Sequence, residues 1–184
     1  MTLAYILIGL IVIAIFFIIS LYNGLVTKRS MMQEAWSGID VSLKKRYDLI
    51  PNLVNTVKGY ATHEKQLLEE VTSLRTKALQ STSVEQKIGI EKELGPALGK
   101  LLVSVENYPD LKASENFRDL QGRLNDIETE LEMSRRYYNG TVRENNIAIE
   151  SFPGNVVASM FKFEKGTFFE IDNSAQRENP TVSF

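Results

Sequence analysis

The most apolar part of the chain runs from Leu3 to Tyr22 and reads LAYILIGLIVIAIFFIISLY, without a charged residue. A helix of this length spans roughly 30 Å, the thickness of the hydrocarbon core of a bilayer. A secretory signal peptide has a basic start, a shorter apolar region and small residues at a cleavage site, and this stretch shows none of these. We therefore predict a membrane span in contact with lipid, with Leu3, Ile11, Phe16 and Tyr22 among its residues.

Beyond this span, apolar residues recur three or four positions apart from Met32 to Ala78, which predicts a long amphipathic helix. Pro51 falls within the pattern. Because the apolar phase continues past it, we expect a kink at Pro51 and not a reversal of the chain. The polar stretch Ser81–Gln86 is the better place for a reversal. A further helix follows over Ile88–Val105, and Asn107–Asp110 has the composition of a turn.

Helix length leaves two arrangements open. A continuous helix over residues 28–80 would be about 80 Å long, while the helix after it would return only about 35 Å. Either the first helix bends sharply, or its far end buries its apolar stripe against another copy of the chain.

The last long helix has the most regular pattern, with apolar positions that alternate in steps of three and four from Phe117 to Phe152, as in a coiled coil. Its second half becomes small and polar, with Asn139, Asn145 and Asn146. A polar residue in such a seam costs stability and fixes register or partner number, so we interpret this layer as a register device and not a ligand site. The packing or interface candidates are Trp36, Pro51, Ser134, Tyr138, Asn145, Phe152 and Val157.

The chain after Pro153-Gly154 predicts a short amphipathic helix over Asn155–Phe163. If the last long helix runs antiparallel to the first, this segment returns toward the membrane. Phe152 and Val157 then either cap the bundle or lie at the membrane interface, where Lys162 and Lys165 extend to the headgroups. The echo of YNGLV (residues 22–26) in YNGTV (residues 138–142) then either marks two segments at the same membrane-proximal level or is a chance match of five residues.

Charge sets the expected orientation. No basic residue precedes the span, while Lys28, Arg29 and the cluster Lys44–Arg46 follow it. Basic residues near a span favour the cytoplasmic side, so we predict a single-pass protein whose long C-terminal part is cytoplasmic. We expect Lys28 and Arg29 to meet lipid headgroups. For Lys44–Arg46 and for Arg135-Arg136, solubility or ion pairing is the simpler interpretation.

Composition excludes several kinds of chemistry. The 184 residues have a net charge of −2, which argues against binding to nucleic acid. There is no cysteine, and the single histidine, His63, begins HEKQL, which lacks the second imidazole of a zinc-protease helix. Glutamates such as Glu128 and Glu132 are expected on a solvated face. We therefore predict no catalytic residue, no metal site, no cofactor and no enzymatic activity.

Two blocks of sequence resemble the LemA family of bacterial membrane proteins: Tyr22–Arg75, which contains RYDLIPNLV, and Arg135–Phe163, which contains SFPGN. The resemblance implies an all-α protein of the bacterial inner membrane, with an N-terminal transmembrane helix and a cytoplasmic domain like a four-helix bundle. We expect a span and juxtamembrane segment over residues 1–27, the bundle over 28–170 and an irregular polar tail over 171–184.

Three functions remain open at this point. The heptad-like stripe and the lack of a catalytic set favour a membrane-anchored scaffold or adaptor that forms homo-oligomers. The family resemblance implies an alternative, a regulatory partner of a membrane zinc metalloprotease of the HtpX type. The basic and apolar surfaces favour a third, a membrane-organising protein that binds lipid.

Overall fold

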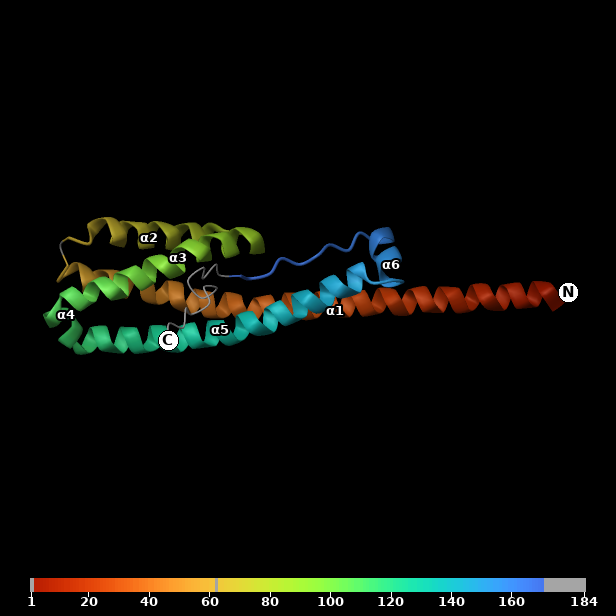
Figure 1. Cartoon of the computed structure of the whole chain (residues 1–184), viewed down its shortest axis with the longest axis horizontal. Coiled ribbons are helices and arrows are strands. Elements are labelled where there is room, and N and C mark those ends of the chain that lie inside the picture. The colour runs from red at the N-terminus through yellow and green to blue at the C-terminus, as the bar shows by residue number, and fades with distance from the viewer. Residues whose placement is uncertain (1, 62, 171–184) are drawn as a thin grey trace, which may run out of the picture. The chain divides into compact units, whose positions relative to one another are not determined.

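The computed structural model describes residues 2–61 and 63–170, so the predicted tail over residues 171–184 lies outside the described residues. All regular elements in these ranges are helices, which confirms the predicted all-α fold (Figure 1). They are α1 (Thr2–Lys58), α2 (Lys65–Gln80), α3 (Val84–Ser104), the 3₁₀ turn η1 (Val105–Asn107), α4 (Pro109–Ala113), α5 (Glu115–Glu150) and α6 (Gly154–Met160).

Helix α1 continues through Pro51, so the prediction that the chain does not reverse there is confirmed. Proline lacks the N–H that would bond to the carbonyl four residues earlier, which is that of Tyr47. This carbonyl oxygen instead accepts a hydrogen bond of 2.7 Å from Arg75 Nε on α2. The side chain of Arg75 thus takes the place of the missing backbone N–H of Pro51 and forms a polar contact between α1 and α2.

The long helical pattern from Met32 to Ala78 forms two helices, because α1 ends at Lys58 and α2 begins at Lys65. Of the two arrangements left open, a sharp bend agrees with this break, since Arg75 of α2 contacts Tyr47 of α1. Tyr60 N and Ala61 N both bond to the carbonyl oxygen of Val57, at 3.0 and 2.8 Å, and close the end of α1. Glycine is among the poorest helix formers, which favours a stop at this point. The apolar phase did not reveal the break because Ala61 stays buried beyond it.

The predicted reversal within Ser81–Gln86 is confirmed, since α2 ends at Gln80 and α3 begins at Val84. The Ser83 side chain caps α3 by accepting a hydrogen bond of 3.1 Å from Gln86 N. The expected turn at Asn107–Asp110 is the junction of η1 and α4, with Pro109 as the first residue of α4.

The chain forms two compact units, and α1 and α5 belong to both. Among the described residues, unit 1 comprises 2–41 and 131–168, and unit 2 comprises 42–61, 63–130 and 169–170. The predicted boundary between residues 27 and 28 is a different kind of division and stays a prediction.

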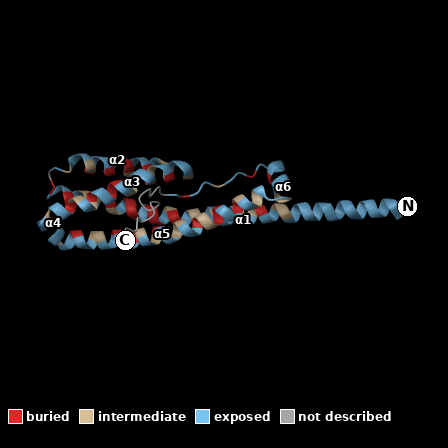
Figure 2. Ribbon diagram, viewed as in Figure 1, coloured by how far each residue is buried: buried red, intermediate tan, exposed pale blue. Residues whose placement is uncertain are grey.

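Unit 2 buries one apolar stripe from each of four helical segments: the end of α1, α2, α3 and the start of α5 (Figure 2). Among its fully enclosed side chains are Leu43 and Ile50 of α1, Val71 of α2, Leu101 of α3 and Phe117 of α5. The described part of unit 2 is thus by itself a small four-helix arrangement, as ridges of apolar side chains on each helix require.

Unit 1 contains the apolar start of α1, the second half of α5, α6 and the segment after it. Pairs between Lys28 and Glu144 and between Trp36 and Tyr138 show that α5 runs antiparallel to α1 within this unit. Figure 2 shows the first turns of α1 exposed throughout. By length and composition, α1 is the one described helix that could cross a membrane.

Candidate functional site

The turn after α5 is formed by the SFPGN sequence. Ser151 N bonds to the carbonyl oxygen of Ile147 at 2.8 Å, and Asn155 N bonds to that of Ser151 at 2.9 Å. The Phe152–Pro153 peptide bond is cis. Gly154 lies against the carbonyl oxygen of Ala148, so close that a Cβ atom would collide with backbone. This position therefore requires glycine for space, and it sets the start of α6.

One side of α6 packs on the end of the apolar run of α1. Val157 and Ala158 are buried together with Leu25 and Phe163, and these four residues are called the corner cluster below. Tyr22 joins its edge, with ring centroids 4.8 Å from Phe161 and 5.7 Å from Phe163 in edge-on geometry. The corner cluster fixes α6 beside the last residue of the predicted span.

The other side of α6 is also apolar but is exposed. Phe152 is 83% exposed, Val156 52% and Met160 64%, and Phe161 is exposed as well. Val156 and Met160 are one turn apart on α6 and so project from one side of it, while Phe152 lies in the turn before the helix. A short helix with apolar residues on both sides is unusual for a surface in contact only with water.

The predicted headgroup residues have different surroundings. Lys28 Nζ pairs with Glu144 Oε2 at 3.1 Å, and Lys165 Nζ pairs with Glu150. The guanidinium of Arg29 stacks on the Phe163 ring, 5.0 Å from its centroid. Lys162 is exposed, follows α6 at a φ of 55°, and has no ion pair among the described residues.

Residues 162–168, called the strap below, lie along α5 within unit 1. The Asn146 side chain holds the strap through both backbone polar groups of Gly166: Nδ2 donates to Gly166 O at 3.0 Å, and Oδ1 accepts from Gly166 N at 2.8 Å. Tyr138 Oη donates to Thr167 O at 2.9 Å. A side chain at Gly166 would meet the sulfur of Met32, so the strap passes close over α1.

The small and polar residues in the second half of α5, called its polar seam here, are buried or half-buried. Asn145 is buried, and its Nδ2 lies 3.4 Å from Asn146 Oδ1. Tyr138 is buried against half-buried Trp36, with centroids 5.4 Å apart, and Ser134 is half-buried. The asparagine that contacts the strap is Asn146, which was not among the predicted interface residues. Its signal in the sequence was only its place in a run of asparagines.

The expected common level of YNGLV and YNGTV is wrong. Tyr22 lies beside Phe161 and Phe163, whereas Tyr138 lies beside Trp36. Trp36 is about four helical turns, or about 20 Å, beyond Tyr22 on α1. The antiparallel pairing places Ala148 and Ile149 of α5, and not residues 138–142, beside the start of the packed part of α1.

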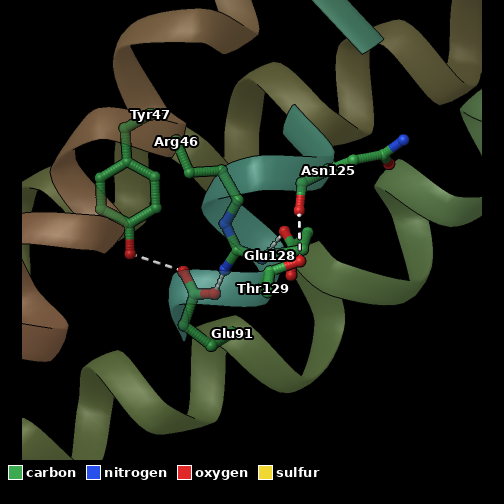
Figure 3. Close-up of polar contacts among 6 residues, drawn as sticks. All are labelled: Arg46, Tyr47, Glu91, Asn125, Glu128 and Thr129. Atoms are coloured by element: carbon green, nitrogen blue, oxygen red, sulfur yellow. Dashed lines mark hydrogen bonds and ion pairs between the residues drawn. The ribbon is translucent and has the colours of Figure 1, made fainter. Parts of the chain in front are cut away.

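A second candidate site is a buried polar cluster in unit 2, formed by Arg46, Tyr47, Glu91 and Glu128 and called the ion cluster below (Figure 3). Arg46 and Glu91 are each 1% exposed. Arg46 Nη2 pairs with Glu91 Oε2, and Arg46 Nη1 lies 2.7 Å from Glu128 Oε1. Tyr47 Oη donates to Glu91 Oε1 at 2.5 Å.

Glu91 was not predicted from the sequence as a site residue. Glu128 was expected on a solvated face, and its side chain is 42% exposed there while it also pairs with the buried Arg46. The signal for Glu91 was present in its spacing. It lies three residues from both Ile88 and Leu94, so it occupies the buried side of α3. A glutamate in that phase must find a partner, because a buried unpaired charge is costly.

The ion cluster links α1, α3 and α5, and its polar groups are occupied by contacts with one another. Its guanidinium contacts carboxylates from α3 and α5, and its tyrosine bonds to one of them. Within residues 2–61 and 63–170, no group of three or more histidine, aspartate or glutamate side chains could hold a metal ion. The arrangement can therefore fix which helices meet and in which register.

An exposed pair lies next to the ion cluster in unit 2. Lys45 Nζ is 2.9 Å from Glu130 Oε2, and Ser42 Oγ donates to the same carboxylate at 3.3 Å. The Lys45 ammonium, through its hydrogen bond and its charge, lowers the pKa of the Glu130 carboxyl below its ordinary value.

Comparison with known proteins gives the lineage. The family model described as LemA family matches residues 35–184. Magnetosome protein MamQ 1 of Paramagnetospirillum magneticum is 25% identical over 175 residues, covering 81% of this chain and 64% of its own length. MamQ of Magnetospirillum gryphiswaldense is 24% identical over 174 residues, covering 80% and 64%. Protein LemA of Metamycoplasma hominis is 27% identical over 150 residues, covering 80% and 68%.

The chain thus spans less than two thirds of the length of the MamQ proteins that it matches. The apolar start of α1 and these relatives together indicate a membrane protein. The matched residues include the ion cluster, the seam of α5 and the corner cluster apart from Leu25. This chain belongs to the LemA family.

Proposed function

We propose that this protein is a membrane-anchored scaffold or adaptor without catalytic activity, which associates with further copies of itself. The main supporting observation is the continuity of α1, a single helix from Thr2 to Lys58. The apolar run and the residues of α1 that pack in unit 1 are therefore parts of one helix. In this proposal α1 crosses the inner membrane once, and the packed helices are cytoplasmic, as the basic residues after the span favour.

The absence of catalysis in this proposal is supported by how the polar residues are used. In the ion cluster, the carboxylates are occupied by a guanidinium and a tyrosine hydroxyl. The one histidine of the chain, His63, is exposed and has no partner histidine. General acid–base or nucleophilic chemistry needs a free group held near a substrate site, and these groups are held for packing.

Self-association is supported by exposed apolar side chains in unit 1 outside the predicted span. Met133 and Tyr137 are each 58% exposed and one turn apart on α5, so they project from the same side. Gly140 continues this stripe and allows a close approach of another helix. On α1, Met31 and Val41 are also exposed. Aromatic and methionine side chains of this kind are enriched in protein interfaces.

Cross-linking through a single thiol tests this proposal, since the chain has no cysteine of its own. The Tyr137→Cys variant of the full-length protein is reconstituted in vesicles and treated with a bismaleimide. The yield of covalent dimer should stay high when the protein is diluted with lipid before the treatment. Arg123→Cys, also exposed on α5, serves as the matched control for random collision. Equal yields from both variants, together with a monomeric mass in detergent at every concentration, would contradict self-association.

A regulatory partnership with a membrane metalloprotease stays a prediction from the family resemblance. Two relatives carry the name magnetosome protein. A role in organising membranes by binding lipid stays a prediction from the basic and apolar surfaces.

A further inference from the structure

The outer face of α6 is an apolar surface that the fold leaves uncovered. Val156 and Met160 project from the helix, and Phe152 and Phe161 extend this surface at its two ends. The inner face is already occupied by the corner cluster, so burial in unit 1 does not account for the outer residues. Four large apolar side chains within ten residues, all more than half exposed, indicate a surface that meets something other than water.

The position of α6 indicates what that partner is. Val157 and Ala158 pack on Leu25, and the Phe161 ring touches Tyr22, the last residue of the apolar run. The outer face is therefore next to the point where the predicted span leaves the hydrocarbon. A tyrosine such as Tyr22 favours this layer of a membrane, because its ring is apolar and its hydroxyl reaches water. The wholly apolar ring of Phe161 suits the acyl side of the same layer.

Charge agrees with this position. Lys162 lies two residues beyond the end of α6 and has no acidic partner among the residues that the structure describes. Arg29 lies about two helical turns beyond Tyr22. It is exposed, and its guanidinium lies over the ring of Phe163. A basic side chain beside an exposed apolar face is the pattern of a helix that lies in the headgroup layer, with its cation at the phosphates.

We infer that α6 is an interfacial membrane helix. Phe152, Val156, Met160 and Phe161 enter the boundary between headgroups and acyl chains of a lipid bilayer, and Lys162 lies at the phosphates. The inference rests on the proposed anchoring of α1, and it adds a second lipid contact at the base of the packed helices. The span and α6 would then contact the bilayer at the same interface. Together they would restrict the tilt of α1 in the membrane, whereas a span alone would not.

Depth-dependent quenching tests the inference with the full-length protein in vesicles. Single cysteines replace Val156, Met160, Val103 and Phe16, one at a time, and carry an environment-sensitive fluorophore. Val103 is the matched control, because it is an exposed valine of α3 in unit 2. Nitroxides at the headgroup, at a shallow acyl position and at a deep acyl position report depth. Unchanged helical circular dichroism establishes that each labelled variant is folded.

The expected result is quenching of the Val156 and Met160 probes, several-fold stronger with shallow than with deep nitroxides, while the Val103 probe is unaffected and the Phe16 probe responds to deep nitroxides. If Phe16 is quenched but Val156 behaves like Val103, the inference fails and the anchoring stands. A Val156 probe that is shielded from water yet not quenched by any lipid nitroxide overturns the inference in favour of a protein partner. Loss of quenching at Phe16 overturns the proposed anchoring.

Discussion

The ion cluster of unit 2 and the corner cluster of unit 1 hold helices together by opposite means. In the ion cluster, the guanidinium of Arg46 and the carboxylate of Glu91 pair inside a low-dielectric core, and the partly exposed Glu128 contacts the same guanidinium from the edge. In the corner cluster, four apolar side chains are buried and charges stay at the rim. Both connect α1 to other helices, but only the first demands one particular set of neighbours.

The difference concerns specificity more than stability. A buried ion pair adds little net stability, because the cost of desolvation offsets the attraction, yet removal of one partner is very unfavourable. Apolar burial instead contributes in proportion to area and tolerates changes of shape. Unit 2 should therefore respond to single substitutions abruptly, and the corner cluster gradually.

The largest effect is expected from Arg46→Ala, which leaves buried Glu91 without its cation. We expect the free energy of unfolding to fall by about 3–5 kcal/mol, measured by urea unfolding of the full-length protein in detergent. The paired change Arg46→Met with Glu91→Leu should recover most of this loss, because apolar residues of similar volume replace both charges.

The surface pair of Arg123 and Asp119 supplies the control for this comparison. Arg123→Ala removes a solvent-exposed ion pair and should cost at most about 1 kcal/mol. A similar cost for Arg46→Ala, or a failure of the paired change to recover stability, would mean that the ion cluster does not specify the packing of unit 2.

A smaller effect is expected in the corner cluster from Val157→Asp. The lost burial of one valine amounts to about 1.5–3 kcal/mol, and α6 should leave Leu25 while unit 2 stays folded. Proteolysis at the strap reports the release of α6. Val156→Asp, on the exposed neighbour, is the control in detergent and should leave stability nearly unchanged. Unaltered stability and unaltered protection of the strap in Val157→Asp would disprove the packing role of α6.

The smallest effect is a pH dependence at Lys45 and Glu130. Since the pKa of Glu130 is lowered in the folded state, this pair stabilises the fold above the ordinary glutamate pKa, and the contribution is lost as pH falls through the lowered value. The difference in unfolding free energy between the wild type and Lys45→Gln should therefore shrink on acidification. A difference that is constant from neutral to acidic pH would show that the pair is not formed in solution.

The apolar periodicity was sufficient to predict an all-helical chain, because Leu124, Leu131 and Tyr138 follow the helical repeat and are buried. Periodicity could not locate the end of α1, since the buried phase passes from Val57 to Ala61 across a non-helical segment. When a helix ends but the apolar residues keep their spacing, the spacing alone cannot show where the helix ends.

The contacts of the candidate sites were harder to predict for a different reason. Glu91 could have been noticed from its phase, but its partner could be identified only from the pairing of α1 with α3. The contact of Asn146 with Gly166 depends on the backbone of a segment without regular structure, which has no periodicity to read. The predicted residues Tyr138 and Val157 are buried because they lie on apolar phases, which the sequence displays directly.

The shortness of α6 has a consequence for how the molecule can be followed in experiments. Seven residues are too few for a helix to persist by itself in water, where helices shorter than about 12 residues are marginal. The amide hydrogens of α6 are consequently protected from exchange only while Val157 and Ala158 stay docked. Exchange at these few amides should thus measure the opening equilibrium of the whole corner cluster, and any ligand or lipid that binds there would slow it.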